Sequence, residues 1–336
     1  MRLFTQMPTR MRLHACTLLV AAAAAAALPL GAAAQGTAYP NRPVTFVVAY
    51  TPGSANDILV RIVAPELGNQ LGQPVVVDNK PGAGGSIGTA LVAKSKADGY
   101  TIGLGSTSTM AINRALYKNL AYDPLKDFVA VIKLASTPNV LAVPSSSSAG
   151  SVQELGKLMG SKKLNFSSPG NGTTQHLAGV LFNKLIGHTA EHVPFKGPAE
   201  AVTALSAGQI DFGFVSLPSA LGQIQQGRLR ALGVTPLSPT AALPSVPSLS
   251  SSGLNGFDRT DVWFGIVLPS GTPEPIVQGI HRAASKTLEN AEVRSKLAAA
   301  GYLPAAPASA TDFQQFVREQ VAFWADLVKT SGATVD

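Results

Sequence analysis

Four loops of this chain are rich in groups that bind anions through backbone N–H groups and hydroxyls. Three of them, residues 52–56, 82–86 and 167–174, combine glycine, proline or asparagine with serine or threonine, and the fourth, residues 106–109, consists of serine and threonine alone; each is expected to open a helix. The first N–H groups of a helix lack intrahelical partners and carry the positive end of its dipole. Such loops indicate seats for a carboxylate or phosphate. A tight turn with a helix cap explains any one of them, but four together favour binding.

One of these loops also has the spelling of a hydrolase nucleophile elbow. Residues 84–88 read Gly-Gly-Ser-Ile-Gly, which would make Ser86 the nucleophile, with Asp258 and His281 as nominal partners. The elbow requires a strand that runs straight into the serine, whereas a loop of six residues separates Asp78 from Gly85. We therefore expect no catalysis, and a secreted serine hydrolase using Ser86 remains an alternative.

Three histidines raise the question of a metal site. His176, His188 and His192 lie near Glu191 in sequence, and the second and third are four residues apart. Pro194 and the strand-like sequence at His192 argue against one helical face, and no thiol or carboxylate cluster completes a coordination shell. The glycine patterns of phosphate loops and dinucleotide sites are missing as well. We expect neither a metal nor a cofactor.

Alternating strands and helices must position these loops. Apolar runs at residues 44–48, 75–77 and 100–104 predict buried strands, with helices at about 58–67 and 86–94. This order predicts an α/β sheet with parallel strands. Ligands of such sheets sit beyond the carboxyl ends of the strands, so three of the loops are expected to line one site.

A second α/β pattern starts near Val140. The expected elements are helices at about 152–159 and 177–185 and from 199, and strands at 164–167, 192–195, 210–215 and 229–234. Residues 237–253 are rich in serine and proline and predict a surface loop. The apolar stretch 262–268 is expected to return to the first lobe. Amphipathic helices at about 275–289 and 312–328 follow.

The first 34 residues have the pattern of an export signal. Arg2, Arg10 and Arg12 precede an apolar run of about 15 residues, whereas a membrane span needs roughly 20. Small residues at 32–34 predict cleavage after Ala34. Cys16, the single cysteine, stands before the apolar run rather than after it, so no lipid attachment is expected.

The charge of the chain points to small anions rather than to nucleic acid. The formal net charge is +7, and removal of the three arginines of the signal leaves +4. The basic residues are scattered, without the aromatic interleaving of nucleic-acid surfaces. A mild positive field favours anionic ligands.

Short motifs occur together over nearly the whole mature chain, from about Tyr39 onward. They are residues 39–43 (Tyr-Pro-Asn-Arg-Pro), Pro52-Gly53 with Asp57 and Arg61, residues 79–88, residues 98–101, Ser168-Pro169-Gly170-x-Gly172, His176-Leu177, residues 193–197 and residues 208–211. In these motifs the chain resembles the periplasmic solute-binding receptors of tripartite tricarboxylate transporters, often called Bug receptors.

The resemblance implies an α/β, two-lobed periplasmic binding protein of type II, the Venus-flytrap kind, with a ligand cleft between the lobes. Lobe 1 would comprise residues 39–138 plus 263–336, and lobe 2 residues 139–262. It implies small carboxylated ligands: di- or tricarboxylates, acidic amino acids or aromatic carboxylates. By position, the ligand contacts would be Gly53, Ser54, Asp57, Gly84, Ser86, Ser106 and Thr107 in lobe 1, and Ser167, Gly170, Thr173, His176, Lys196 and Asp211 in lobe 2.

Some of these positions have a second interpretation. Asp57 would repel a carboxylate and could brace its own loop instead, and Lys196 could be merely solvated. Ser54 stands where the family usually has a glycine, and Phe195 where it often has a tyrosine. Ser54 adds a hydroxyl donor beside the expected carboxylate. Phe195 removes a phenol, which motivates the hypothesis of a less polar or aromatic carboxylate.

The sequence therefore predicts a monomeric periplasmic receptor that closes on a carboxylate and delivers it to the membrane subunits of a tripartite tricarboxylate transporter. A receptor of the same fold that feeds a sensor kinase is the first alternative, and an orphan scavenger is another. The sequence leaves the identity of the ligand open.

Overall fold

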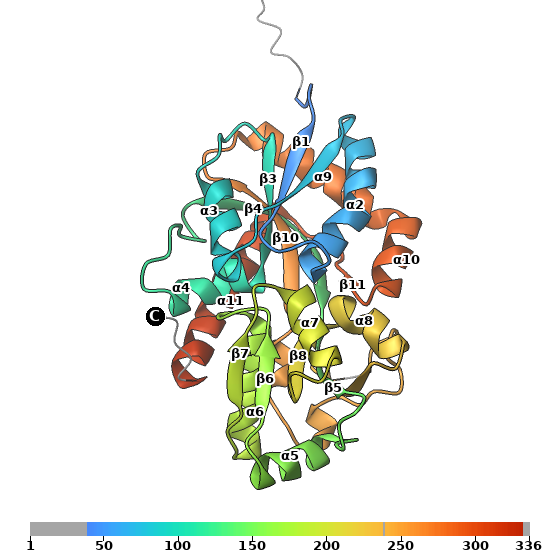
Figure 1. Ribbon diagram of the computed structural model, residues 1–336. Helices are drawn as coiled ribbons and strands as arrows, with labels where there is room; N and C mark the ends of the chain where they lie inside the picture. Colours follow the sequence, from blue (N-terminus) through green and yellow to red (C-terminus); the bar gives the residue numbers. More distant parts are fainter. Residues whose placement is uncertain (1–38, 238, 332–336) are drawn as a thin grey trace, which may run out of the picture. The chain divides into compact units, whose positions relative to one another are not determined.

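Two mixed β-sheets with helices packed on them form the part of the chain that the computed structural model describes, residues 39–237 and 239–331 (Figure 1). The predicted export signal and its cleavage site lie outside the described residues. Pro40 begins one compact unit that contains both sheets. Across the described ranges, we find no helix with the length and hydropathy needed to cross a membrane.

The first sheet takes strands from two distant parts of the sequence. Its strands are β1 (Val44–Val48), β2 (Val75–Asn79), β3 (Thr101–Ser106), β4 (Phe128–Thr137), β10 (Val262–Pro269) and β11 (Leu303–Pro304), in the order β11-β4-β10-β3-β1-β2. β1 runs parallel to β2 and β3, as predicted. β10 returns to this sheet, also as predicted, but it pairs antiparallel with β3 and β4. The parallel strands predicted from the sequence are therefore present at β1, β2 and β3, and β10 makes the sheet mixed.

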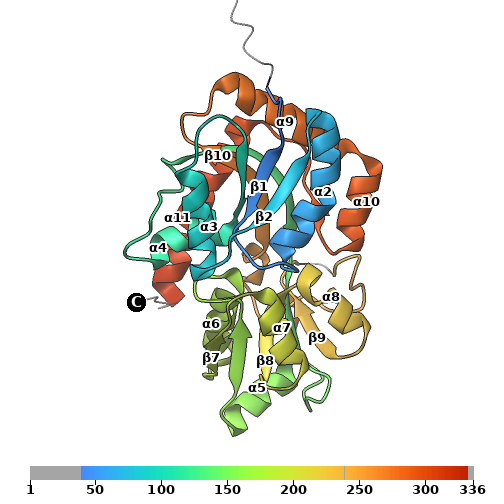
Figure 2. The ribbon, with the colours of Figure 1, turned by 45° about the horizontal axis from the view of Figure 1, so that its top comes forward.

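Helices cover both faces of the first sheet (Figure 2). They are α2 (Ala55–Leu71), α3 (Ser86–Ala93), α4 (Asn113–Leu116), α9 (Glu274–Glu289), α10 (Ala291–Ala299) and α11 (Ala310–Ser331), with short turns at Ala83–Gly85 (η1) and Ser108–Ile112 (η2). Val47 packs in one cluster with Val92 of α3 and Phe313 of α11. α2 packs against α9 and α10. Because both faces are covered, β1 is apolar along almost its whole length.

The second sheet comes from one continuous stretch. Its elements are β5 (Asn139–Pro144), β6 (Asn165–Ser168), β7 (Glu191–Pro194), β8 (Phe212–Ser216) and β9 (Leu229–Val234), in the order β7-β6-β8-β5-β9, with helices α5 (Val152–Ser161), α6 (Thr174–Ile186), α7 (Pro198–Ser206) and α8 (Leu217–Gln225). Side chains of β5 alternate between the faces, as a strand requires. Leu141 packs with α5 and α6, and Val140 with α7 and α8.

The segment after β9 departs from the prediction of a surface loop. Leu249 is fully buried, and Leu243 and Val246 are also buried in the second sheet's cores. The segment includes the short turn η3 (Ser250–Ser252), and a further turn, η4 (Phe257–Arg259), precedes β10. The surface-loop prediction is therefore wrong for these leucine and valine positions, which the surrounding serines and prolines concealed.

The chain passes between the sheets at Pro138 and again just before β10. Asn139 connects these two segments, because its Nδ2 donates a hydrogen bond to the carbonyl of Thr260 (2.9 Å). Its Oδ1 also accepts a hydrogen bond from Nε2 of Gln175 in α6 (2.8 Å). The colours of Figure 1 show the same topology: strands of the first sheet come from both ends of the sequence, and those of the second from the green-to-yellow middle.

Candidate functional site

Residues of both sheets line one small pocket. They are Tyr50, Asn56, Ser106, Ser108, Pro169, Thr173, Thr174, Gln175, Pro198, Ser216, Val262 and Phe264. The pocket has a volume of about 30 Å³, which is the share of one water molecule in liquid water. Among the described residues that line it, none carries a charge at neutral pH. Any charge of a ligand must therefore be met by dipoles and hydrogen bonds.

The N-terminus of α2 contributes to this pocket. Ser54 is the N-cap, and its hydroxyl accepts from the N–H of Asp57 (3.2 Å), while its carbonyl accepts from the N–H of Ile58 (2.9 Å). The cap therefore leaves the N–H groups of Ala55 and Asn56, the first two of the helix, to other partners. Asn56 lines the pocket.

The N-terminus of α6 has the same construction in the second sheet. The Thr173 hydroxyl accepts from the N–H of His176 (3.2 Å), and the Thr173 carbonyl accepts from that of Leu177 (3.1 Å). The cap leaves the N–H groups of Thr174 and Gln175, and both residues line the pocket. Two helix N-termini from different sheets thus meet at one uncharged cavity, which favours a bound anion.

Tyr50 and Ser106 follow β1 and end β3, where the sequence predicted loops of the site. The Tyr50 hydroxyl donates to the carbonyl of Gly84 (3.0 Å). Burial raises the pKa of Tyr50 to about 12, against the smaller opposing effect of the Ser108 and Ser106 hydroxyls, so the phenol is neutral. The N–H of Ser106 donates to Thr109 Oγ1 (3.1 Å).

Of the site residues predicted from the sequence, Ser106 and Thr173 line the pocket. Ser54 and Thr107 lie close to it in sequence, but their hydroxyls are engaged within the protein. Ser54 caps α2, and Thr107 Oγ1 accepts from the N–H of Trp263 (2.8 Å). Asn56, Ser108 and Thr174 fall within the loops predicted to bind an anion but were not named as contacts, and Gln175 falls just outside them. The signal that could have found them is the capping pattern, because the residues that follow a cap carry the free N–H groups.

Asp57 braces the loop after β1. Its carboxylate accepts from the N–H of Gly53 (2.9 Å), from Arg61 Nε (2.9 Å) and from Asn79 Nδ2 (3.0 Å). Burial by itself raises the pKa of Asp57, but the hydrogen bonds from Arg61, Gly53 and Asn79 and the charge of Arg61 outweigh it, so the pKa is lowered. The arrangement agrees with the bracing interpretation of Asp57.

His176 lies on the first turn of α6 and directly follows the pocket residues Thr174 and Gln175 in sequence. It is buried, its Nδ1 accepts from the N–H of Gly172 (3.3 Å), and its ring stacks on that of His192 at 4.1 Å. Burial lowers the pKa of His176 to about 4, and burial together with His176 lowers that of His192 to about 3. His176 therefore holds the 170–173 loop as a neutral ring.

The other second-lobe residues lie in different surroundings. Gly170 accepts through its carbonyl from the Thr173 hydroxyl (2.9 Å), and Lys196 is exposed. The Ser167 hydroxyl is buried without a partner among the described residues. Asp211 stands before β8, at the amino end of the strands, where it accepts from the N–H of Asn165 (2.9 Å). The structure therefore does not bring Asp211 to the pocket.

Ser86 lacks the surroundings of a nucleophile. Its hydroxyl accepts from Asn113 Nδ2 (3.0 Å), and the same amide donates to the carbonyl of Gly84 (3.2 Å). His281, its nominal base, is bonded instead to the carbonyl of Ala308 (2.8 Å). Within the described ranges no group of three or more histidine, cysteine, aspartate or glutamate side chains is placed to hold a metal.

Three glycines lie where the two sheets' loops touch. A Cβ on Gly84 would lie 2.8 Å from the carbonyl oxygen of Asn171, and one on Gly197 would lie 2.5 Å from Thr51 Oγ1. A Cβ on Gly172 would lie 2.6 Å from Leu116 Cδ2. Apolar residues also cross this contact, since Leu177 packs with Leu116 and Trp324.

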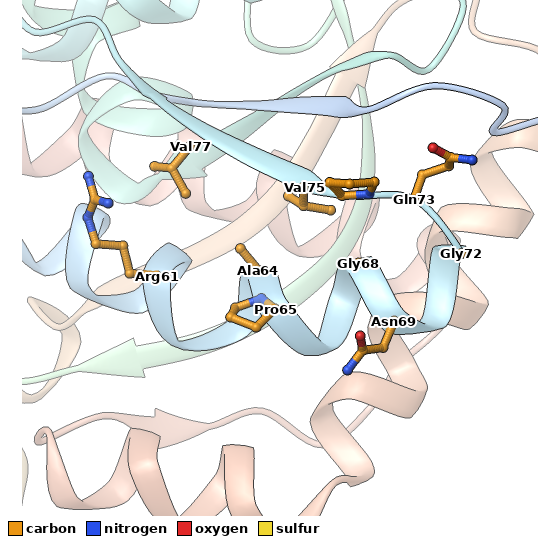
Figure 3. A pocket seen from close by; sticks show the side chains of 10 residues that line it. Arg61, Ala64, Pro65, Gly68, Asn69, Gly72, Gln73, Val75 and Val77 are labelled. Carbon is orange, nitrogen blue, oxygen red and sulfur yellow. The ribbon is translucent and has the colours of Figure 1, made fainter.

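A larger groove of about 740 Å³ lies on the outer side of α2 and β2 (Figure 3). Figure 3 shows Arg61, Pro65 and Asn69 along the helix, opposite Val75 and Val77 of the edge strand. Residues of this groove all come from α2, β2 and the turn between them. It presents neither a helix N-terminus nor a residue of the second sheet, so it lacks the features that mark the small pocket.

The two sheets and the pocket between their helix N-termini define the class of two-lobed periplasmic binding proteins. A family model described as "Tripartite tricarboxylate transporter family receptor" matches residues 59–333. The chain belongs to this family, whose members are periplasmic solute-binding proteins, and both the resemblance and the predicted fold class are confirmed.

Solved structures support the same assignment. The periplasmic binding protein BugD is 30% identical, with a TM-score of 0.84, over 88% of this chain and 99% of that one. MatC from Rhodopseudomonas palustris, with bound malate, is 32% identical, with a TM-score of 0.82, over 86% and 100%. An R. palustris protein with adipate is 33% identical, with a TM-score of 0.85, over 88% and 100%.

Proposed function

We propose that this protein captures a small carboxylate in the pocket between α2 and α6 and delivers it to the membrane subunits of a tripartite tricarboxylate transporter. One observation carries the proposal: the capped N-termini of α2, beside the first sheet, and of α6, beside the second, meet at a pocket that no charged side chain of the described residues lines. Their free N–H groups, at Asn56 and at Thr174 and Gln175, provide donors for one or two carboxylates. The malate and adipate of the two R. palustris structures are ligands of this class.

The size of the pocket implies a movement of the lobes. A cavity of about 30 Å³ is too small for a dicarboxylate, so the lobes separate to admit one. The lobes are taken as residues 39–138 plus 263–336 and residues 139–262, a division supported by the strands of each sheet. A ligand that contacts both lobes favours the closed arrangement, because it makes more contacts there.

The remaining features of the proposal concern location and partners. The protein is exported by its N-terminal signal, cleaved after Ala34, and works in the periplasm as a monomer without a cofactor. It is a receptor rather than an enzyme, since Ser86 faces an amide instead of a base. The other contacts expected by family position, except Asp211, remain part of this proposal. A receptor that serves a sensor kinase would have the same site.

A thermal-shift screen of the mature chain tests the proposal. A carboxylate at about 100 times its dissociation constant stabilises the folded state by about 2.7 kcal/mol, which raises the Tm by about 5 °C. The screen includes malate, succinate, adipate, citrate, benzoate and glutamate, each beside its neutral amide as the matched control. Shifts with acids but not amides support the proposal, and a flat response to every acid contradicts it.

A further inference from the structure

Asn56 differs from the other amides around the pocket. Its side chain is only 8% exposed, lines the pocket, and makes no hydrogen bond to any described residue; its Oδ1 is fully enclosed without a donor. By contrast, Gln175, which also lines the pocket, and the nearby Asn139 are hydrogen-bonded to each other. Buried polar groups are almost always paired, so an unpaired amide that lines a pocket points to a partner from outside the chain.

The chemistry of that partner follows from the atom that is unpaired. Oδ1 of an amide is an acceptor, and a carboxylate oxygen is an acceptor too, so a simple carboxylate cannot satisfy it. The partner must donate a hydrogen bond, as a hydroxyl or an ammonium group does. The two R. palustris ligands differ in this respect, because malate carries a hydroxyl and adipate does not.

The position of Asn56 also places the donor relative to the carboxylate. Asn56 is the second residue of α2, and its own N–H is one of the two that the Ser54 cap leaves for an anion. The amide side chain starts from the same residue, so acceptor and anion seat lie only a few bonds apart. A group that uses both carries its donor on a carbon close to its carboxylate.

We propose that Asn56 is a specificity-determining residue that selects carboxylates with a neighbouring hydroxyl or ammonium group over acids without one. The proposal rests on the carboxylate-binding function proposed above. One well-placed neutral hydrogen bond, together with the cost of leaving Oδ1 unpaired, corresponds to a preference of about tenfold.

Titration calorimetry with matched acids tests this selection on the mature chain. Each set shares one length and differs only in the donor: succinate, malate and aspartate; glutarate, 2-hydroxyglutarate and glutamate; adipate, 2-hydroxyadipate and 2-aminoadipate. We expect the donor-bearing acid to bind about tenfold or more tightly within the set that fits. The hydroxy and amino members distinguish the two kinds of donor.

Replacing Asn56 assigns the preference to its side chain. Asn56→Leu keeps the branched shape of the side chain and removes the acceptor, so the preference should fall to about twofold or less through weaker binding of the donor-bearing acid. Asn56→Ala is the second variant, in case leucine disturbs folding, and Tm is measured for both. Asn69→Leu is the matched control, because Asn69 lies on the same helix, exposed, and bonded to Glu66 (3.1 Å).

The outcomes separate this proposal from the one on which it rests. Equal binding of all acids of a set by the unaltered protein, or a tenfold preference that survives in both Asn56 variants, overturns the selection but leaves the receptor function in place. Failure of every acid to bind overturns the receptor function and the selection with it.

Discussion

Ser54 and Thr173 have the same role, as helix N-caps, at two sides of the small pocket. Each hydroxyl accepts the third N–H of its helix, at Asp57 and His176, and is thereby withdrawn from direct contact with a ligand. An N-cap of this kind stabilises a helix by about 1 kcal/mol relative to alanine. Ser54 therefore contributes to the helix, and Asn56, two residues further on, carries the side chain that lines the pocket.

The neutral state of His176 predicts a dependence of stability on pH. Its pKa is about 4 in the folded protein, against an ordinary value of 6.5, so between these values the unfolded chain binds the proton and the folded chain does not. Stability from this residue is complete above pH 6.5 and is lost as the pH falls toward 4. Between pH 7 and pH 5 we expect His176 to account for a loss of about 2 kcal/mol in the free energy of unfolding, beside a loss of the same sign from its neighbour His192.

Denaturant unfolding at pH 5, 6 and 7 measures this loss in His176→Asn. Asparagine keeps an acceptor for the N–H of Gly172 but does not titrate, so its stability should fall less with acid than that of the unaltered protein. Asp261, whose pKa burial raises to about 7, titrates in the same range with the opposite sign, so the difference between variants is the readout. The exposed His188→Asn is the control, and identical slopes for His176→Asn and the unaltered protein would contradict the assignment.

At the scale of elements, the C-terminal helix α11 is fixed to β10 through one amide. Gln320 Oε1 accepts from Trp263 Nε1 of β10 (3.0 Å) and from Trp324 Nε1 of α11 (3.1 Å), and both indoles are buried. Gln320→Leu leaves two indole N–H groups unpaired, which should lower the free energy of unfolding by about 3 kcal/mol and the Tm by about 6 °C. Gln315→Leu, exposed on the same helix, should change the Tm by 1 °C or less. Equal Tm values for the two variants would show that the shared amide does not fix the helix.

The elements also show what the sequence could and could not predict. β1, β2, α2 and α6 have uniform apolar patterns with clear caps, and they were predicted within a few residues. β4 was missed because Lys133 interrupts its apolar run; in the fold this ammonium lies 4.7 Å from the centre of the Phe316 ring, where its charge is tolerated. α8 and α10, of nine residues each, were also missed.

Strand direction and the ligand-facing residues depend on tertiary contacts. The chain enters the second sheet through β5 and returns through β10, and both run antiparallel to their neighbours, a choice that local sequence does not encode. The pocket was predicted at the correct strand ends. Gln175 was missed because the predicted loop ended at Thr174, whereas the pocket also includes the next residue of α6.

At the scale of the whole molecule, Thr51 of the first lobe lies against Gly197 of the second, so the proposed closure should depend on the space between them. Gly197 has a φ of −178°, an extended conformation that alanine adopts without strain, but its Cβ would lie 2.5 Å from Thr51 Oγ1. Gly197→Ala should therefore leave each lobe intact and disfavour only the closed arrangement. Since ligand affinity includes the free energy of closure, we expect the dissociation constant to rise about tenfold, mainly through faster release.

Thr51→Ala should reverse this effect. The Thr51 hydroxyl is buried without a partner among the described residues, so its removal alone should leave the Tm unchanged or slightly higher. In the double variant, alanine at both positions restores space between the lobes, and affinity should return to within about twofold of the unaltered protein. Calorimetry with the acid that gives the largest thermal shift measures all four proteins. Because the two substitutions lie in different lobes, rescue would arise only if these lobes approach each other around the ligand as they do here. Additive losses in the double variant would mean that the ligand is held in a wider arrangement.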